Sequence, residues 1–143
     1  MFVNDVLIDD VKFTINRYGY LEPFHPPSST IAKLKLVNGK NSISFKVSTV
    51  SLGADIFLYE RDDRIIISDL DGTMTKTDIT GLLSNYRQVR YIHDGYDLFI
   101  KELFDKGYKI VWITMRSIAL YNFSKNYIEK EVGCFGALLP EPE

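Results

Sequence analysis

The strongest chemical signal in the sequence is a pair of acidic residues, Asp69 and Asp71, in the segment Asp69-Leu70-Asp71-Gly72-Thr73. The pair directly follows an apolar run, 65–68, which is typical of a strand covered on both faces. Residues two apart in a strand face the same side. We therefore expect both carboxylates to approach one space at the edge where α/β sheets bind ligands. Carboxylates this close repel each other unless they share a cation or one keeps a proton.

Either arrangement permits phosphoryl transfer. A metal-bound carboxylate can attack phosphorus and form an aspartyl-phosphate. A neighbouring protonated carboxyl can donate its proton to the leaving oxygen. Gly72 lets the backbone turn sharply beside a substrate. Two other interpretations of the motif remain open: the Asp-Gly bend of a hairpin, and a calcium loop whose first ligand position falls on Ile67.

A second group of candidate residues, Thr114, Met115 and Arg116, follows a strand predicted over Tyr108 to Ile113. Because neighbouring parallel strands end at the same edge, we expect Thr114 to lie within reach of a group bound at Asp69. A hydroxyl and a following N–H at a helix start form an anion site, to which Arg116 would add charge. The alternatives are a structural threonine and a surface arginine.

The elements that position these residues alternate between strand and helix after residue 63. A helix is predicted from Asp94 to Lys106, with Asp94 as its N-cap and Gly107 as its stop. Its apolar stripe consists of Tyr96, Phe99, Ile100, Leu103 and Phe104. A second helix is predicted from Ser117 to about Glu131, before Gly133. This order indicates a parallel α/β unit with a right-handed crossover.

The first half of the chain shows strand signals, with a boundary near Arg61. Strands are predicted over Phe2 to Ile8, Val11 to Ile15, Ser42 to Val50 and Asp55 to Glu60. The strand at Ser42 to Val50 alternates apolar and polar residues, as expected of one buried and one wet face. A loop is predicted at Pro23, Pro26 and Pro27, and a turn at 38–41; the segment 31–36 fits either a strand or a helical turn. These short strands predict a β-sandwich or part of one, so we expect two domains, 1–61 and 62–143.

The composition is that of a globular chain. Of 143 residues, 45% are hydrophobic and 25% are charged, which excludes disordered and collagen-like proteins. With 17 Lys+Arg and 19 Asp+Glu the net charge is −2, which argues against a nucleic-acid binder that works by bulk charge. The single cysteine, Cys134, suits a reducing compartment. No apolar run approaches the ~18 residues of a membrane span and no signal peptide is evident, so we expect a soluble intracellular protein.

The run from Asp62 to Asp78 resembles the haloacid-dehalogenase-like phosphatases, and more narrowly the lipin family of phosphatidate phosphatases. Asp69, Asp71 and Thr73 match the first motif, Asp-x-Asp-x-Thr, and Thr114 matches the Ser or Thr of the second. The resemblance covers roughly residues 34–140. It is also carried by Leu36 to Asn41, Ile56 to Tyr59, His93, Gly95, Gly107 to Lys109, Thr114 to Ile118, and Leu138 to Pro140.

The resemblance implies an immunoglobulin-like β-domain (1–61) followed by the N-terminal half of a Rossmann-like phosphatase domain (62–143). It implies Mg²⁺-dependent conversion of phosphatidate to diacylglycerol at a membrane surface. Asp69 is then the nucleophile and a metal ligand. Asp71 is the general acid and then the base, and a second metal ligand through its backbone carbonyl. The phosphate-binding residues are Thr73, Thr114, Met115 and Arg116.

The third and fourth motifs of the family, a Lys or Arg and an acidic group, have no match in the sequence. In lipins they lie beyond the Leu-Leu-Pro stretch, so we expect a lipin-type phosphatase that is shortened or incompletely represented. The alternatives are a non-catalytic module that binds anionic lipid or protein, and a phosphatase for soluble phosphoesters. The resemblance implies a cytoplasmic protein, peripheral at the endoplasmic reticulum or nuclear envelope, with a nuclear location as a further option.

Overall fold

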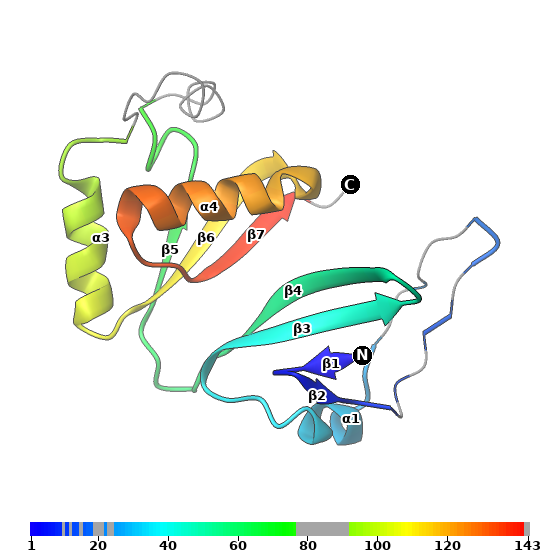
Figure 1. The fold of residues 1–143 in the computed structure, drawn as a ribbon. Coiled ribbons are helices and arrows are strands. Elements are labelled where there is room, and N and C mark those ends of the chain that lie inside the picture. Colours follow the sequence, from blue (N-terminus) through cyan, green and yellow to red (C-terminus); the bar gives the residue numbers. More distant parts are fainter. Residues whose placement is uncertain are drawn as a thin grey trace. The chain divides into compact units, whose positions relative to one another are not determined.

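The computed structural model describes residues 1–9, 11, 13–14, 16–18, 22, 25–76 and 92–141 (Figure 1). The chain forms two compact units, Met1–Glu60 (unit 1) and Arg61–Glu143 (unit 2). Unit 1 contains an antiparallel sheet, and unit 2 contains a parallel sheet with helices. The predicted mixture of a β part and an α/β part is confirmed in this coarse form.

Unit 1 is built on a four-stranded antiparallel sheet with the order β2-β1-β3-β4. The strands are β1 (Phe2–Val3), β2 (Val6–Leu7), β3 (Gly39–Val47) and β4 (Val50–Leu58). A short helix, α1 (Ser28–Lys33), precedes β3 and resolves the ambiguous segment in favour of a helical turn. The described residues of unit 1 form one sheet, so they do not supply the second layer of the predicted sandwich.

Several strand boundaries in unit 1 differ from the prediction because turns interrupt them. Asn4 and Asp5 have φ values of 46° and 64°, as in tight hairpin turns, so the segment 2–8 is a hairpin and not one strand. Ser48 (φ 53°) likewise ends β3 before Val50, which begins β4.

Two further segments of unit 1 can be compared with the sequence. The described residues of 11–15 have no regular structure, so a strand there is wrong; Lys12 and Ile15 lie outside the described residues. The predicted loop is irregular at Pro26 and Pro27, whereas Pro23 also lies outside. The predicted turn is reduced to Asn38, because β3 already begins at residue 39.

Unit 2 alternates strands and helices around a parallel sheet with the order β5-β6-β7. The strands are β5 (Ile65–Asp69), β6 (Lys109–Ser117) and β7 (Ala137–Glu141). Helix α3 (Tyr96–Asp105) precedes β6 in the chain. The short η1 (Ile118–Leu120) and α4 (Tyr121–Val132) connect β6 to β7. The predicted parallel α/β pattern is confirmed, and β7 is a strand that the sequence analysis did not identify.

Glycines end the helices α3 and α4, as predicted. Gly107 has φ 85°, and its N–H donates to Phe104 O while Tyr108 N–H donates to Leu103 O, which is the Schellman arrangement. Gly133 (φ 77°) ends α4 in the same left-handed conformation. At the start of α3 the prediction is wrong, because Gly95 and not Asp94 is the capping residue.

The two faces of the parallel sheet have different surroundings. One face packs against α3 and α4 in a single core that contains Ile100, Ile110, Trp112, Ile128 and Leu138. Phe99 and Phe104, which the predicted stripe of α3 included, are exposed.

The opposite face of the sheet is apolar and largely exposed, although Val111 of β6 is only 9% exposed. Ile65, Ile67, Ile113 and Leu139 are between 41% and 65% exposed. The expectation that β5 is covered on both faces is therefore wrong, because α3 and α4, the α-helices in the described part of unit 2, pack on one side of the sheet.

Candidate active site

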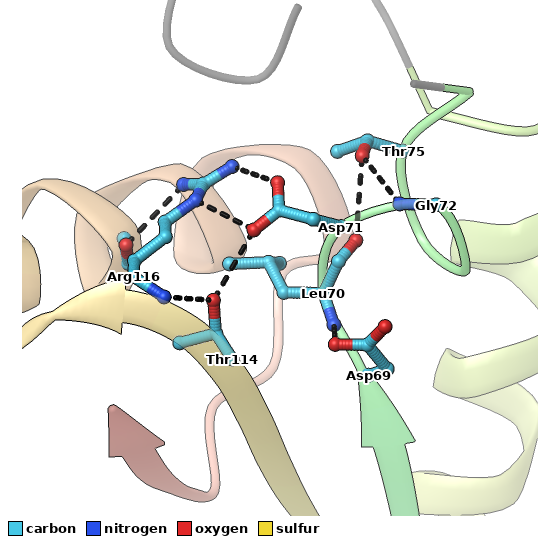
Figure 2. A network of polar contacts seen from close by, with 8 residues as sticks. Asp69, Leu70, Asp71, Gly72, Thr75, Thr114 and Arg116 are labelled. Atoms are coloured by element: carbon cyan, nitrogen blue, oxygen red, sulfur yellow. Dashed lines mark hydrogen bonds and ion pairs between the residues drawn. The ribbon is translucent and has the colours of Figure 1, made fainter. Parts of the chain in front are cut away.

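The acidic motif lies in a tight turn at the carboxyl end of β5 (Figure 2). Leu70 is fully buried and its N–H donates to Ile113 O of β6, so the turn is tied to the neighbouring strand. Leu70 O accepts the N–H groups of Met74 and Thr75 at 3.2 and 3.1 Å. Because β5 pairs in parallel with β6, the motif is not the bend of a hairpin; because it follows a strand, it lacks the helix that precedes a calcium loop.

Thr75 holds this turn from inside. Its hydroxyl accepts the N–H of Gly72 at 3.2 Å and donates to Leu70 O at 3.4 Å (Figure 2). Thr75 is fully buried, and Gly72 adopts φ 79°, a conformation that favours glycine. This role of Thr75 was not predicted from the sequence, although a threonine three residues after a turn glycine is a signal that points to it.

Asp71 is the centre of a polar cluster with two residues of β6. The Thr114 hydroxyl donates to Asp71 Oδ2 at 3.2 Å. Arg116 Nε donates to the same oxygen at 2.8 Å, and Arg116 Nη2 donates to Oδ1 at 2.5 Å. The Arg116 N–H also donates to the Thr114 hydroxyl at 3.1 Å. Residues from β5 and β6 therefore meet at one edge, as the parallel arrangement predicts (Figure 2).

Arg116 does not take the exposed position that an anion site or a surface bridge would give it. Its side chain is 6% exposed, against 19% for Asp71. Its Nη1 donates to the Ser124 hydroxyl of α4 at 3.3 Å. Ser124 was missed in the sequence analysis, since nothing local marks a helical serine that only packing brings to Arg116.

Asp69 occupies the end of β5 but points in a different direction from Asp71 in Figure 2. Its Oδ1 accepts the N–H of Leu70 at 2.8 Å. The expectation that the two carboxylates face the same side rested on strand periodicity, which ends at Asp69 because Asp71 already belongs to the turn. The carboxylate oxygens of Asp69 and Asp71 therefore point in different directions.

A hydroxyl pair supports the end of β5. Ser68 Oγ lies 2.5 Å from the Tyr96 hydroxyl and donates to Asp69 O at 3.1 Å. Burial raises the pKa of Tyr96 above its ordinary value; the hydrogen bond with Ser68 opposes this rise, and the negative charge of Asp69 adds to it. Tyr96 is therefore a neutral hydroxyl at neutral pH, and it links the start of α3 to the strand that carries Asp69.

The remaining predicted residues are more exposed. Thr73 lies on the outside of the turn, and Met115 is 78% exposed. The helix predicted from Ser117 begins later, because β6 continues to Ser117 with a change in register beyond Ile113, and α4 starts at Tyr121 after η1. Of the predicted residues, the structure brings Asp71, Thr114 and Arg116 into contact.

The described residues contain no group of three or more His, Cys, Asp or Glu side chains arranged to hold a metal ion. Mg²⁺, however, commonly binds to one or two carboxylates, with water and substrate phosphate completing its shell. The Asp69 carboxylate is an oxygen donor of this kind. Both oxygens of the Asp71 carboxylate are engaged by Arg116, so the backbone carbonyl of Asp71 fits a metal better than its side chain does.

Comparisons with known proteins give a consistent result. The family model LNS2 (Lipin/Ned1/Smp2) matches residues 22–141. The phosphatidate phosphatase LPIN2 of Homo sapiens is 32% identical over 126 residues, which cover 85% of this chain and 14% of that protein. The phosphatidate phosphatase PAH1 of Arabidopsis thaliana is 31% identical over 108 residues, 72% of this chain and 12% of that protein. Nuclear elongation and deformation protein 1 of Schizosaccharomyces pombe is 30% identical over 111 residues, 76% of this chain and 17% of that protein.

Proposed function

Because the chain belongs to the LNS2 (Lipin/Ned1/Smp2) family, as its motifs predicted, we propose that it is a Mg²⁺-dependent phosphatidate phosphatase. The observation that carries the proposal is the placement of the Asp69-to-Thr73 motif at the end of β5, beside Thr114 of β6. This placement lies inside the region shared with relatives that are named phosphatidate phosphatases. The chain spans 12–17% of the length of these relatives, so the activity is proposed for this chain and not carried over as fact.

The proposed reaction has two halves. In the first, the Asp69 carboxylate attacks phosphorus, the bond from phosphorus to the glycerol oxygen breaks, and a proton on Asp71 passes to that oxygen to release diacylglycerol. In the second, Asp71 takes a proton from water as that water attacks the aspartyl-phosphate. Inorganic phosphate leaves and Asp69 is regenerated. Thr114, at the same edge, binds the phosphoryl oxygens.

The metal would be held by the Asp69 carboxylate and the Asp71 backbone carbonyl. When bound, Mg²⁺ neutralises the charge that otherwise keeps an anionic nucleophile away from an anionic phosphate. The positive charge of the buried Arg116 is paired with Asp71. Asp69 is therefore the acidic side chain of the motif that would bind a cation. Thr73 and Met115 are proposed to contact the phosphate through the turn and through the end of β6.

We also propose the finer architecture that the family implies. Unit 1 would be part of an immunoglobulin-like domain, supported by its antiparallel sheet, and unit 2 the first half of a Rossmann-like phosphatase domain, supported by the order β5-β6-β7. None of the helices in the described part of the chain has the length and apolar character that a membrane span requires. Phosphatidate would be reached by peripheral attachment to the endoplasmic reticulum or nuclear envelope, from the cytoplasm or the nucleus.

The test is phosphate release by the purified chain from phosphatidate in mixed micelles, with and without Mg²⁺. Release should require the metal, and Asp69→Asn should lower it by at least about 1,000-fold, because the nucleophile is lost. Asp105→Asn is the matched control: it removes an exposed carboxylate at the end of α3 and should leave the rate unchanged.

Two other results would replace this proposal. Binding to phosphatidate micelles without turnover, unaffected by Asp69→Asn, identifies a non-catalytic lipid-binding module. Metal-dependent hydrolysis of small phosphate esters, with no action on phosphatidate, identifies a phosphatase for soluble substrates.

A further inference from the structure

Arg116 was expected among the phosphate-binding residues, but its contacts indicate another task. We propose that Arg116 is a positioning residue that holds the Asp71 carboxylate ready to take the proton of the attacking water. The inference rests on the proposed function and deepens it, because it assigns Arg116 to the second half of the reaction and removes it from phosphate binding.

The first support is the geometry of the pair. Arg116 Nε donates to Asp71 Oδ2 at 2.8 Å and Nη2 donates to Oδ1 at 2.5 Å (Figure 2). Two parallel hydrogen bonds from one guanidinium to one carboxylate fix both the position and the plane of the carboxylate. A lysine at this position would supply charge without that orientation.

The second support is the burial of the guanidinium behind Asp71. Its third nitrogen, Nη1, donates to Ser124 Oγ at 3.3 Å, and the ring centre of Phe123 lies 5.9 Å from the guanidinium carbon. The side chain is 6% exposed. To reach a phosphoryl group, Arg116 would have to leave Asp71 and Ser124, which would strand a buried charge, so the pair favours staying together.

The third support is the set of hydrogen bonds that the Asp71 carboxylate accepts. Oδ1 accepts one hydrogen bond and Oδ2 accepts two, the second from the Thr114 hydroxyl at 3.2 Å. All three contacts treat the group as an acceptor, which is the form that takes a proton from water. The first half of the reaction needs a proton on Asp71 instead. The pair therefore matters most for hydrolysis of the aspartyl-phosphate.

The experiment compares the full chain with Arg116→Gln, and uses Arg64→Gln as the matched control. Arg64 lies before β5 and stacks on Tyr108, 4.6 Å from the ring centre, away from the motif. For Arg116→Gln, kcat on phosphatidate should fall by about 100-fold, the lower end of what a positioned general base contributes. KM should fall in parallel, so that kcat/KM changes little. Diacylglycerol should appear in a burst, and the chain should accumulate one phosphoryl group, detected by its mass.

Two results would overturn the assignment. A raised KM together with weaker inhibition by inorganic phosphate would make Arg116 a phosphate ligand. A lower kcat with unchanged KM, no burst and no phosphorylated chain would place the effect of Arg116 before the aspartyl-phosphate forms, and would end its assignment to the attack of water. Arg64→Gln should show none of these changes.

A failure of the proposed function would look different, because the unaltered chain would then release no phosphate. The proposed role of Arg116 in water attack would then also be rejected. The interaction between Arg116 and Asp71 would still be tested by its effect on unfolding. Arg116→Gln, Asp71→Asn and the double variant should give non-additive changes, with a discrepancy of about 10-fold or more in the equilibrium constant of unfolding. Additive changes would show that the two side chains are not coupled in solution.

Discussion

The two faces of the parallel sheet in unit 2 are both apolar, but they differ in how far their side chains are exposed. On β6, Ile110, Trp112 and Thr114 are 7% exposed or less. Of the alternating residues, Val111 is 9% exposed, whereas Ile113 and Met115 are 41% and 78% exposed. The helices α3 and α4 cover the first set and leave the second open. Strand periodicity separates the two sets of side chains, because successive side chains point to opposite faces, and the packing of the helices determines which set is covered.

The same division runs through the candidate active site. Thr114 and Arg116 share the covered face, and they draw the Asp71 carboxylate to that side. Asp69 is two and four residues from Ile67 and Ile65, and so it belongs to the open face of β5. The covered face therefore positions a buried pair, while the open face presents the proposed nucleophile.

The largest effect that tests this comparison is the loss of a buried side chain. Ile110→Ala, on the covered face at 2% exposed, should lower the free energy of unfolding by about 2–5 kcal/mol, since it removes packed methyl groups and leaves a cavity. Denaturant unfolding measures the loss. The matched control is Ile67→Ala, where the side chain is 65% exposed and the change should stay below about 1 kcal/mol. Equal losses at the two positions would contradict the division into a covered and an open face.

A smaller effect is expected when the open face is made polar. Ile67→Thr keeps a β-branched residue in the strand, so the free energy of unfolding should change by no more than about 0.5 kcal/mol. Binding of the apolar dye ANS should fall, because the exposed apolar patch shrinks. Ile110→Ala, if it stays folded, is the comparison for dye binding. If neither variant changes the binding of ANS, the dye binds to a surface other than the open face.

The smallest effect concerns Cys134, which belongs to the covered core. Burial raises the pKa of its thiol above 9.0; the negative charge of Asp105 adds to this and Lys101 opposes it. Because the folded pKa exceeds the unfolded one, this stabilisation is complete below about pH 9 and is lost as the pH rises through the folded pKa. Cys134→Ala should therefore flatten the alkaline decline in unfolding free energy, measured by denaturant titrations at several pH values. An unchanged slope would show that other groups cause the decline.

Much of unit 2 could be predicted because its signals are local. Gly107 and Gly133 end helices because the residue after each helix adopts a left-handed conformation, which favours glycine. The Asp69-to-Thr73 motif directly follows an apolar strand. The strand β7 escaped prediction because five residues with a proline carry little pattern of their own, and pairing with β6 forms the strand. The hairpin at 2–7 was missed for a similar reason, since Asn4 and Asp5 take left-handed φ values that composition alone does not specify.

The family of this protein, the order β5, α3, β6 and α4, and the place of the acidic motif at a strand end could be predicted from the sequence. These features depend on residues that are close in the sequence and on the periodicity of the apolar residues among them. Only the tertiary structure decided that Arg116 pairs with Asp71, 45 positions away, and that one face of the sheet stays open. The partner of a side chain depends on which strands become neighbours and which face the helices cover, and neither is written in any local stretch of the chain.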